Sequence, residues 1–277
     1  MNKLLWSQIY NKKSSDGFQV TQKSFTHTIN LHYIRSRCTR CGICELICPK
    51  TAIKLEEHDR NFIQINEKKC VRCGICAYFC MFHALQIEHV LFGDINKDEV
   101  VMNKIGGLPD LNAKITIFND KCNLCKTCEK VCPRSAITIK EDKLEINNDL
   151  CILCGWCAST CPESAIEVVK LFQGNLLFND INVKQDEIKD LVSICPSECI
   201  RYKDLDLNRI RNVKTKKILG HDPDKITWLK DFCIFCGACQ KLKPELIKEI
   251  KRIDINAADP FLENRIWVEI KKKLFNE

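Results

Sequence analysis

Several features are scarce in this chain of 277 residues. It contains 10 glycines and 8 prolines, which excludes collagen-like and low-complexity sequences. No stretch reaches the roughly 18 apolar residues that a membrane-spanning helix needs. At the start only Leu4-Leu5-Trp6 is apolar, which is too short for the apolar region of a signal peptide. We therefore expect a cytoplasmic protein without a membrane span, and peripheral membrane association stays open.

Cysteine, by contrast, is abundant, with 21 of the 277 residues. Disulfide-rich domains are short and secreted, and an odd count leaves one thiol unpaired, so a disulfide framework fits poorly. Hydrophobic residues make up 45% of the chain and charged residues 29%, with a formal net charge of +7, which excludes a disordered chain. Metal or cluster ligation is the better expectation for so many thiols.

Most of the cysteines follow one spacing, C-x2-C-x2-C-x3-C, in four separate groups. The groups are Cys38, Cys41, Cys44 and Cys48; Cys70, Cys73, Cys76 and Cys80; Cys122, Cys125, Cys128 and Cys132; and Cys151, Cys154, Cys157 and Cys161. The short gaps wind a tight loop that points three sulfurs and several backbone N–H groups at one compact core, the bacterial pattern for [4Fe–4S] ligation. Zinc sites need two well-separated pairs, and no x3 gap continues as the C-x3-C-x2-C of radical-SAM enzymes. We expect each fourth cysteine to open a short helix.

A repeat accompanies each group. Proline follows the fourth cysteine in three groups, at Pro49, Pro133 and Pro162, and Met81 takes that place in the other. Four residues after the fourth cysteine comes an alanine, at Ala52, Ala84, Ala136 and Ala165. An aliphatic residue and a period-two alternation follow, which predict a half-buried strand. The unit is loop, helix and strand, and two units make one module with a pseudo-twofold axis.

The remaining cysteines extend this repeat. Cys195 and Pro196 align with the fourth cysteine and its proline, and Cys199 aligns with the alanine. The three upstream ligand positions of this half-module hold Gln185, Ile188 and Leu191. We expect Cys199 to be a small buried residue, and a fourth ligand or a redox thiol are the alternatives.

The last three cysteines complete a site. Cys233, Cys236 and Cys239 keep the two-residue gaps, but Lys243 stands at the fourth position, followed by Pro244. One half-module lacks its three loop cysteines and the other lacks its fourth cysteine. The triplet and Cys195 together therefore predict one complete four-cysteine site. Its partner site is absent.

These motifs make the chain similar to the polyferredoxins, which are built of fused two-cluster ferredoxin modules. They read CTRCGICELICPKTAI, CVRCGICAYFCMFHAL, CNLCKTCEKVCPRSAI and CILCGWCASTCPESAI. The resemblance covers about residues 30–88, 113–169 and, in degraded form, 175–250. It departs from the pattern at Met81 and at Lys126, where the other complete motifs have glycine. Such proteins serve as electron-carrying subunits beside hydrogenases and formylmethanofuran dehydrogenases in anaerobic methanogenic archaea.

The resemblance implies that each fourth cysteine crosses to the other cluster of its module. The implied ligands are Cys38, Cys41, Cys44 and Cys80 for cluster 1; Cys70, Cys73, Cys76 and Cys48 for cluster 2; Cys122, Cys125, Cys128 and Cys161 for cluster 3; Cys151, Cys154, Cys157 and Cys132 for cluster 4; and Cys233, Cys236, Cys239 and Cys195 for cluster 5. The inventory is five [4Fe–4S] clusters.

The expected fold is α+β, with three tandem ferredoxin-like [4Fe–4S] modules, the third degenerate with one cluster. The expected parts are an N-terminal extension (1–29), a two-cluster module (30–88), a linker (89–112), a two-cluster module (113–169), a degenerate one-cluster module (170–250) with an insertion (201–232), and a C-terminal helical extension (251–277). Helical spacing of Leu5, Trp6, Ile9 and Tyr10 predicts a helix near the start, and the apolar spacing over 261–275 predicts another.

The predicted function is electron transfer, as a non-catalytic subunit that binds other subunits of a redox complex such as a hydrogenase. The alternatives are an iron–sulfur enzyme with its own activity, a freely diffusing carrier and a cluster-based sensor. The sequence has no dinucleotide fingerprint and no nucleic-acid-binding motif, so we expect no nucleic acid partner. Lys126 is predicted to raise the potential of cluster 3 above that of cluster 4, unless solvent screens its charge. Trp156 is predicted to pack rather than to relay electrons.

Overall fold

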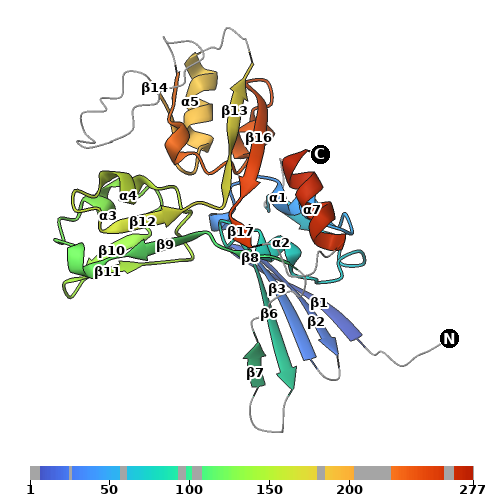
Figure 1. Ribbon diagram of the computed structural model, residues 1–277. Helices are drawn as coiled ribbons and strands as arrows, with labels where there is room; N and C mark the ends of the chain where they lie inside the picture. The colour runs from blue at the N-terminus through green and yellow to red at the C-terminus, as the bar shows by residue number, and fades with distance from the viewer. Residues whose placement is uncertain are drawn as a thin grey trace. The chain divides into compact units, whose positions relative to one another are not determined.

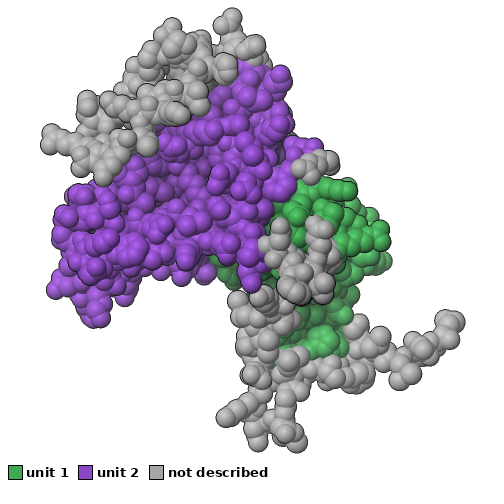
Figure 2. All heavy atoms as spheres, in the orientation of Figure 1, with its two compact units in different colours: residues 1–108, 261–274 green, residues 109–260, 275–277 purple. Residues whose placement is uncertain are grey.

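The computed structural model describes residues 7–24, 27–56, 61–92, 98–101, 108–179, 185–202, 226–258 and 265–276. The chain divides into two compact units: residues 1–108 with 261–274, and residues 109–260 with 275–277. Figure 2 shows them in green and purple. Within the described residues, no helix has the length and apolar character to cross a membrane.

The first unit contains an antiparallel five-stranded sheet with the order β1-β2-β3-β6-β7 (Figure 1). Its strands are β1 (Ser7–Ser14), β2 (Gly17–Ser24), β3 (His27–Ile34), β6 (Leu85–Phe92) and β7 (Asp98–Val101). The helix predicted near the start is wrong where the structure describes it, because residues 7–14 pair with β2 as a hairpin. Ile9 and Tyr10 are exposed on this edge strand, so their spacing does not mark a buried helix face. At the hairpin turn Gly17 has φ +136°, and a Cβ there would lie 1.9 Å from the Tyr33 carbonyl oxygen.

Strand pairing repeats three times along the chain. In each set of four strands the first pairs with the fourth and the second with the third, always antiparallel. The sets are β3, β4 (Ile53–Leu55), β5 (Ile63–Ile65) and β6; β9 (Lys114–Ile117), β10 (Ile137–Lys140), β11 (Lys143–Ile146) and β12 (Ile166–Val169); and β13 (Phe172–Phe178), β14 (Ile200–Tyr202), β15 (Ile226–Trp228) and β16 (Ile247–Ile255). The strands predicted after each alanine are confirmed as β4, β6, β10 and β12. A further short pair joins β8 (Asp110–Leu111) to β17 (Ala257–Ala258).

A short helix lies in each cysteine loop. These helices are α1 (Ile43–Ile47), α2 (Ile75–Tyr78), α3 (Thr127–Val131), α4 (Trp156–Thr160) and α6 (Ala238–Leu242). The prediction that the fourth cysteine opens the helix is wrong: the third cysteine lies inside the helix, and Cys48, Cys132 and Cys161 are C-caps. The proline after each of these residues therefore stands just beyond a helix end, where it cannot continue the helix.

Two longer helices lie outside the cysteine loops. Helix α5 (Gln185–Ile194) occupies the stretch in which the third set lacks cysteines, and its Leu191 is fully buried. Helix α7 (Arg265–Phe275) lies within the C-terminal extension (251–277) predicted to be helical. The prediction is wrong for the start of that extension, because residues 251–255 belong to β16 and residues 257–258 form β17. In the first unit, the Trp267 side chain of α7 stacks on the Phe79 ring, with ring centroids 5.9 Å apart and an angle of 5° between the planes.

The apolar cores around the cysteines are small and contain the cysteines themselves. In the second unit one buried cluster comprises Cys128, Ile137, Leu144, Cys157 and Ile166. In the first unit the corresponding cluster includes Cys48, and five further cysteines pack against it. Thiols therefore belong to the apolar core of the first and second sets of strands.

Some predicted features lie outside the described residues. They are Leu5 and Trp6 of the predicted N-terminal helix, residues 93–97 and 102–107 of the linker, and residues 203–225 of the insertion. The ends of the insertion are described: β14 and β15 pair there, with Ile200 opposite Trp228.

Candidate metal centres

All five three-cysteine loops follow the same backbone path. In each, the residue before the second cysteine and the residue after it adopt left-handed φ values between 51° and 98°. The first position holds Arg40, Arg72, Leu124, Leu153 and Phe235, and the second holds Gly42, Gly74, Lys126, Gly155 and Gly237. Two left-handed residues, one on each side of the second cysteine, turn the chain tightly around the space into which the cysteines project. The loop at residues 233–239 shares this geometry although its motif is incomplete.

A second recurring geometry surrounds the fourth cysteine of each repeat. The residue three positions later is left-handed, at Thr51, His83, Ser135, Ser164 and Glu198. The turn aims the next backbone N–H at the sulfur: the amides of Ala52, Ala136 and Ala165 donate to Cys48, Cys132 and Cys161 Sγ over 3.2, 3.2 and 3.3 Å. These alanines are almost fully buried, so the repeat needs a small residue at that position. Cys195 carries the same turn, with Glu198 at φ 52°.

Four cavities are lined by cysteines in the combinations that the crossing pattern implies. The Cys70 cavity is lined by Cys48, Cys70, Cys73 and Cys76. The Cys122 cavity is lined by Cys122, Cys125, Cys128 and Cys161. The Cys151 cavity is lined by Cys132, Cys151, Cys154 and Cys157. The Cys233 cavity is lined by Cys195, Cys199, Cys233, Cys236 and Cys239.

The remaining predicted set, Cys38, Cys41, Cys44 and Cys80, is also brought together. Burial raises the pKa of the Cys44 thiol well above its usual value, and the charges of Cys41, Cys76, Cys80 and Cys38 raise it further. The Tyr33 hydroxyl is buried beside this set, and it has no hydrogen-bond partner of good geometry among the described residues. The Cys38 and Cys44 thiols both influence its pKa, which burial raises first. A buried hydroxyl donor next to thiols fits a sulfur-rich anionic group.

Burial raises the pKa of several of these thiols above its usual value. It raises the pKa of Cys128 and of Cys154 to about 11, and neighbouring cysteines add to the effect. It also raises the pKa of Cys76, Cys157 and Cys239. A buried thiolate needs a positive partner, and iron supplies one, since a coordinating thiol is deprotonated outright. The donor set therefore fits a metal cluster. Among the described residues, no three His, Cys, Asp or Glu side chains converge closely enough to hold a single metal ion.

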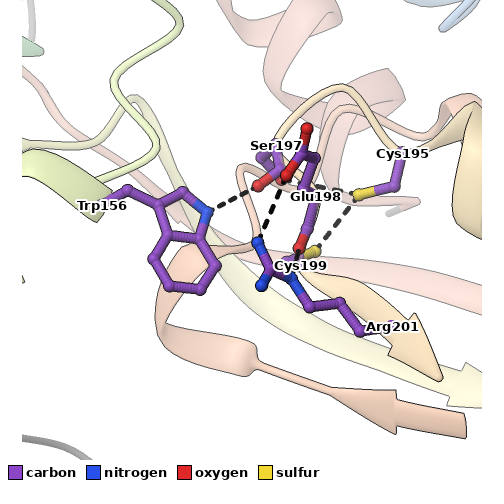
Figure 3. Close-up of polar contacts among 6 residues, drawn as sticks. All are labelled: Trp156, Cys195, Ser197, Glu198, Cys199 and Arg201. Atoms are coloured by element: carbon purple, nitrogen blue, oxygen red, sulfur yellow. Dashed lines mark hydrogen bonds and ion pairs between the residues drawn. The ribbon is translucent and has the colours of Figure 1, made fainter. Parts of the chain in front are cut away.

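The Cys233 cavity contains a fifth thiol. Cys199 is buried, and its Sγ lies 3.4 Å from Cys195 Sγ. Hydrogen bonds from Cys199 and Ser197 lower the pKa of Cys195 to about 6 although burial opposes this. Figure 3 shows Cys195, Ser197 and Cys199 around this turn. The sequence placed Cys199 in an alanine position, and the structure adds that this position faces the sulfurs.

Basic side chains hold the loop of this cavity. Arg252, on β16, is buried and donates from Nε to the Phe235 carbonyl and from a terminal nitrogen to the Cys236 carbonyl, both over 2.9 Å. Lys170 Nζ donates to the carbonyls of Asp231 and Cys233, the latter over 3.2 Å. The sequence motif gave no sign of these two residues, because they lie outside the cysteine repeat.

Protein side chains occupy the place where the third set lacks the partner of the Cys233 site. Lys243, which stands at its fourth-ligand position, forms an ion pair with Asp190 of α5 over 3.0 Å. Leu191 fills a place that the repeat assigns to a ligand, and it is fully buried. A helix and an ion pair therefore occupy this half of the third set.

Comparisons with known proteins agree with this geometry. Residues 37–84 and 121–173 match a family model described as a 4Fe-4S dicluster domain. Over 110 residues the chain is 29% identical to the polyferredoxin protein MvhB of Methanothermobacter marburgensis, a match that covers 39% of this chain and 22% of the relative. The matched segment thus spans about a fifth of that relative's length. These matches confirm the resemblance to polyferredoxins predicted from the cysteine motifs.

A solved structure matches nearly the whole chain. It is a chain of the formate dehydrogenase – heterodisulfide reductase – formylmethanofuran dehydrogenase complex from Methanospirillum hungatei. The identity is 25%, the TM-score is 0.73, and the match covers 97% of this chain and 91% of the other. The similarity therefore includes the third set of strands and the N-terminal hairpin as well as the two dicluster segments.

Proposed function

We propose that this chain, which carries two 4Fe-4S dicluster domains, transfers electrons through five [4Fe–4S] clusters as a polyferredoxin-type subunit of an anaerobic redox complex. The observation that supports the proposal most directly is the grouping of the cysteines. Each of four cavities is lined by three cysteines of one loop and the fourth cysteine of another. The same set of donors recurs in all four cavities, which favours one kind of cofactor throughout.

The proposed ligands are those that the crossing pattern implies. Cluster 2 would occupy the Cys70 cavity, cluster 3 the Cys122 cavity, cluster 4 the Cys151 cavity and cluster 5 the Cys233 cavity, with Cys195 rather than Cys199 as its fourth ligand. Cluster 1 would be held by Cys38, Cys41, Cys44 and Cys80. We also propose that residues 170–250 are a degenerate third module, because its four strands pair as in the other two sets.

[4Fe–4S] clusters supply one-electron oxidation and reduction when bound. Groups of the chain hold the clusters and set their reduction potentials. The amides of Ala52, Ala136 and Ala165 donate to ligand sulfurs, which spreads negative charge and favours the reduced state. Cys73 and Cys125 are exposed, whereas every cysteine of the Cys233 cavity is buried. Outside partners would therefore exchange electrons most readily near clusters 2 and 3.

The proposed setting is the cytoplasm of an anaerobe, with peripheral membrane association open. The M. hungatei match favours an assembly that contains formylmethanofuran dehydrogenase, and the name of the M. marburgensis relative identifies it as a polyferredoxin. A hydrogenase remains a candidate partner. The alternatives are a freely diffusing carrier and an iron–sulfur enzyme with its own substrate.

Anaerobic reconstitution of the full chain tests the cluster count. Five clusters predict about twenty irons and about twenty sulfides per chain. A value of about sixteen would remove cluster 5 and leave the two dicluster domains. An anaerobic native pull-down with mass spectrometry tests the setting, because recovery of the chain without other subunits would favour the free carrier.

A further inference from the structure

One tryptophan forms part of the wall between two cavities of the second unit. Trp156 lines the Cys151 cavity and is 1% exposed. Its indole N–H donates to the carbonyl oxygen of Ser197 over 2.7 Å, and Ser197 lines the Cys233 cavity. Figure 3 shows the indole directed at the turn that carries Cys195 and Cys199. A single side chain and one hydrogen bond therefore connect the linings of the two cavities.

The indole is also fixed on its ring faces by residues near the Cys233 cavity. Phe232, which precedes the ligand Cys233, stacks on Trp156 with centroids 3.6 Å apart and planes within 4°. The Arg201 guanidinium lies over the same indole at 4.7 Å. Arg201 is held in turn by the carbonyl and the carboxylate of Glu198, at 2.9 and 3.2 Å. Trp156 is thus clamped by the segments that carry Cys195 and Cys233.

A cation lies at the same junction. Lys170 lies between β12 of the second dicluster domain and β13 of the third set, which begins at Phe172. The Lys170 Nζ donates to the Asp231 and Cys233 carbonyls of the Cys233 loop. Its Cε packs toward Gly155 of the Cys151 cavity, where an added Cβ would lie 3.7 Å away. One ammonium group therefore lies close to the loops of both cavities.

We infer that Trp156, Phe232 and Lys170 form a junction through which clusters 4 and 5 exchange electrons, and that the Lys170 charge raises the reduction potential of both. This inference rests on the proposed function. Electron tunnelling falls off steeply with distance, so the thinnest protein wall determines the route. The ligand cysteines of cluster 5 are all buried, and this junction gives the cluster an internal neighbour. A thiolate-ligated cluster is anionic, so a nearby fixed cation favours its reduced form.

All three are positioning residues. Trp156 and Phe232 set the thickness of the wall, and Lys170 adds charge. Lys170 also joins the two loops by hydrogen bonds, so a merely structural role has to be separated from an electrostatic one. The reduction potential makes this distinction, because a lysine that only braces the loops can be replaced by another donor without changing it.

The experiment is a redox titration of the reconstituted full chain, followed by EPR, on three variants of Lys170. Lys170→Met removes charge and donor, Lys170→Gln removes the charge but keeps donor protons, and Lys170→Arg keeps both. Lys140→Met, at an exposed lysine of the β10–β11 hairpin, is the matched control. We expect the midpoint potentials of two clusters to fall in Lys170→Met and in Lys170→Gln. In Lys170→Arg and in the Lys140→Met control, all midpoint potentials should stay at wild-type values.

Two results would overturn the inference. One is a set of midpoints in Lys170→Gln and Lys170→Met equal to those of wild type while the iron content is retained. The other is a fall of one midpoint only, which would confine Lys170 to a single cluster. The rate of electron transfer between the two clusters gives a second measurement: after rapid partial reduction, equilibration between clusters 4 and 5 should slow in Trp156→Ala with Phe232→Ala, and an unchanged rate would contradict the route. Failure of the proposed function is separate, because it would appear as missing iron in the unmutated chain.

Discussion

Lys126 occupies a backbone position for which a lysine is poorly suited. It has φ 62°, whereas the equivalent residue of the other four loops is glycine. A residue with a Cβ loses roughly 1 kcal/mol or more in the left-handed region. The side chain is exposed, so solvent screens its charge. The sequence hypothesis that Lys126 raises the potential of cluster 3 stays a prediction, and the exposure argues for a small effect.

Lys126→Gly should therefore stabilise the reconstituted chain by about 1 kcal/mol. The gain comes from relief of left-handed strain, and denaturant unfolding under anaerobic conditions measures it. Gly155→Lys, at the equivalent position of the neighbouring loop, is the reverse substitution and should destabilise by a similar amount. Equal stability of Lys126→Gly and wild type would show that the loop relaxes around the lysine.

Cys199 tests how the fifth site is ligated. In the other four repeats alanine takes this position and is almost fully buried, so Cys199→Ala should keep about twenty irons per chain. Cys195→Ala should drop to about sixteen, because it removes a proposed ligand. Iron and sulfide assays after anaerobic reconstitution give both values. Loss of iron in Cys199→Ala would make Cys199 the fourth ligand instead, an alternative that the sequence left open.

At the scale of elements, helix α7 supports a cysteine loop from outside the repeat. Trp267 is fully buried against Phe79, and Phe79 is the C-cap of α2, directly before Cys80. The packing of the C-terminal helix therefore bears on the position of a proposed cluster 1 ligand.

Trp267→Ala should destabilise the first unit by about 3–5 kcal/mol, the usual cost of emptying a buried aromatic site. Ile266→Ala, on the same helix but 41% exposed, should stay within about 0.5 kcal/mol of wild type. Thermal unfolding of the holo chain compares the two variants. If both lost the same amount, the stacking on Phe79 would not be the source.

The elements also show where sequence reasoning succeeded and where it failed. The alanine and the alternating residues after each fourth cysteine predicted β4, β6, β10 and β12, because a repeated local pattern reports a repeated local structure. The position of the short helices was missed, since spacing alone does not show that the fourth cysteine ends a helix. The left-handed pair in each loop was hidden too, because only one of its two positions is usually glycine and the other holds arginine, leucine or phenylalanine.

The hairpin of β1 and β2 differs from the predicted helix because edge-strand residues such as Ile9 can fall at helical spacing while they remain exposed.

The sequence did not predict contacts between residues that lie far apart along the chain. Trp156 was expected to pack, and it does, but its partners Ser197 and Phe232 lie 41 and 76 positions further along the chain (197 − 156 and 232 − 156). Lys170 and Arg252 reach the Cys233 loop from outside every motif.

At the scale of the whole molecule, the proposed clusters replace much of an ordinary core. The buried cluster of the second dicluster domain contains two cysteines among its five residues. Small domains with so little apolar core need a metal or another cross-link to be stable. Metal binding to such a site contributes directly to the free energy of folding.

Removal of the clusters by an anaerobic iron chelator should therefore unfold the cysteine-containing modules. We expect the melting temperature to fall and the near-ultraviolet circular dichroism of the buried tryptophans to be lost, whereas a chelator-free control keeps both. Readdition of iron and sulfide should restore the signal. An apo chain that kept its native near-ultraviolet spectrum would show that the protein core alone suffices.

The position of Trp156 has a consequence for how the holo protein is made. One indole contributes to the lining of the Cys151 cavity and is anchored on the lining of the Cys233 cavity, so neither pocket has its final shape until the other does. Insertion of the first of these two clusters should therefore lower the cost of inserting the second. In titrations with limiting iron and sulfide, the pair should fill cooperatively, and chains with both sites loaded or both empty should outnumber those with one.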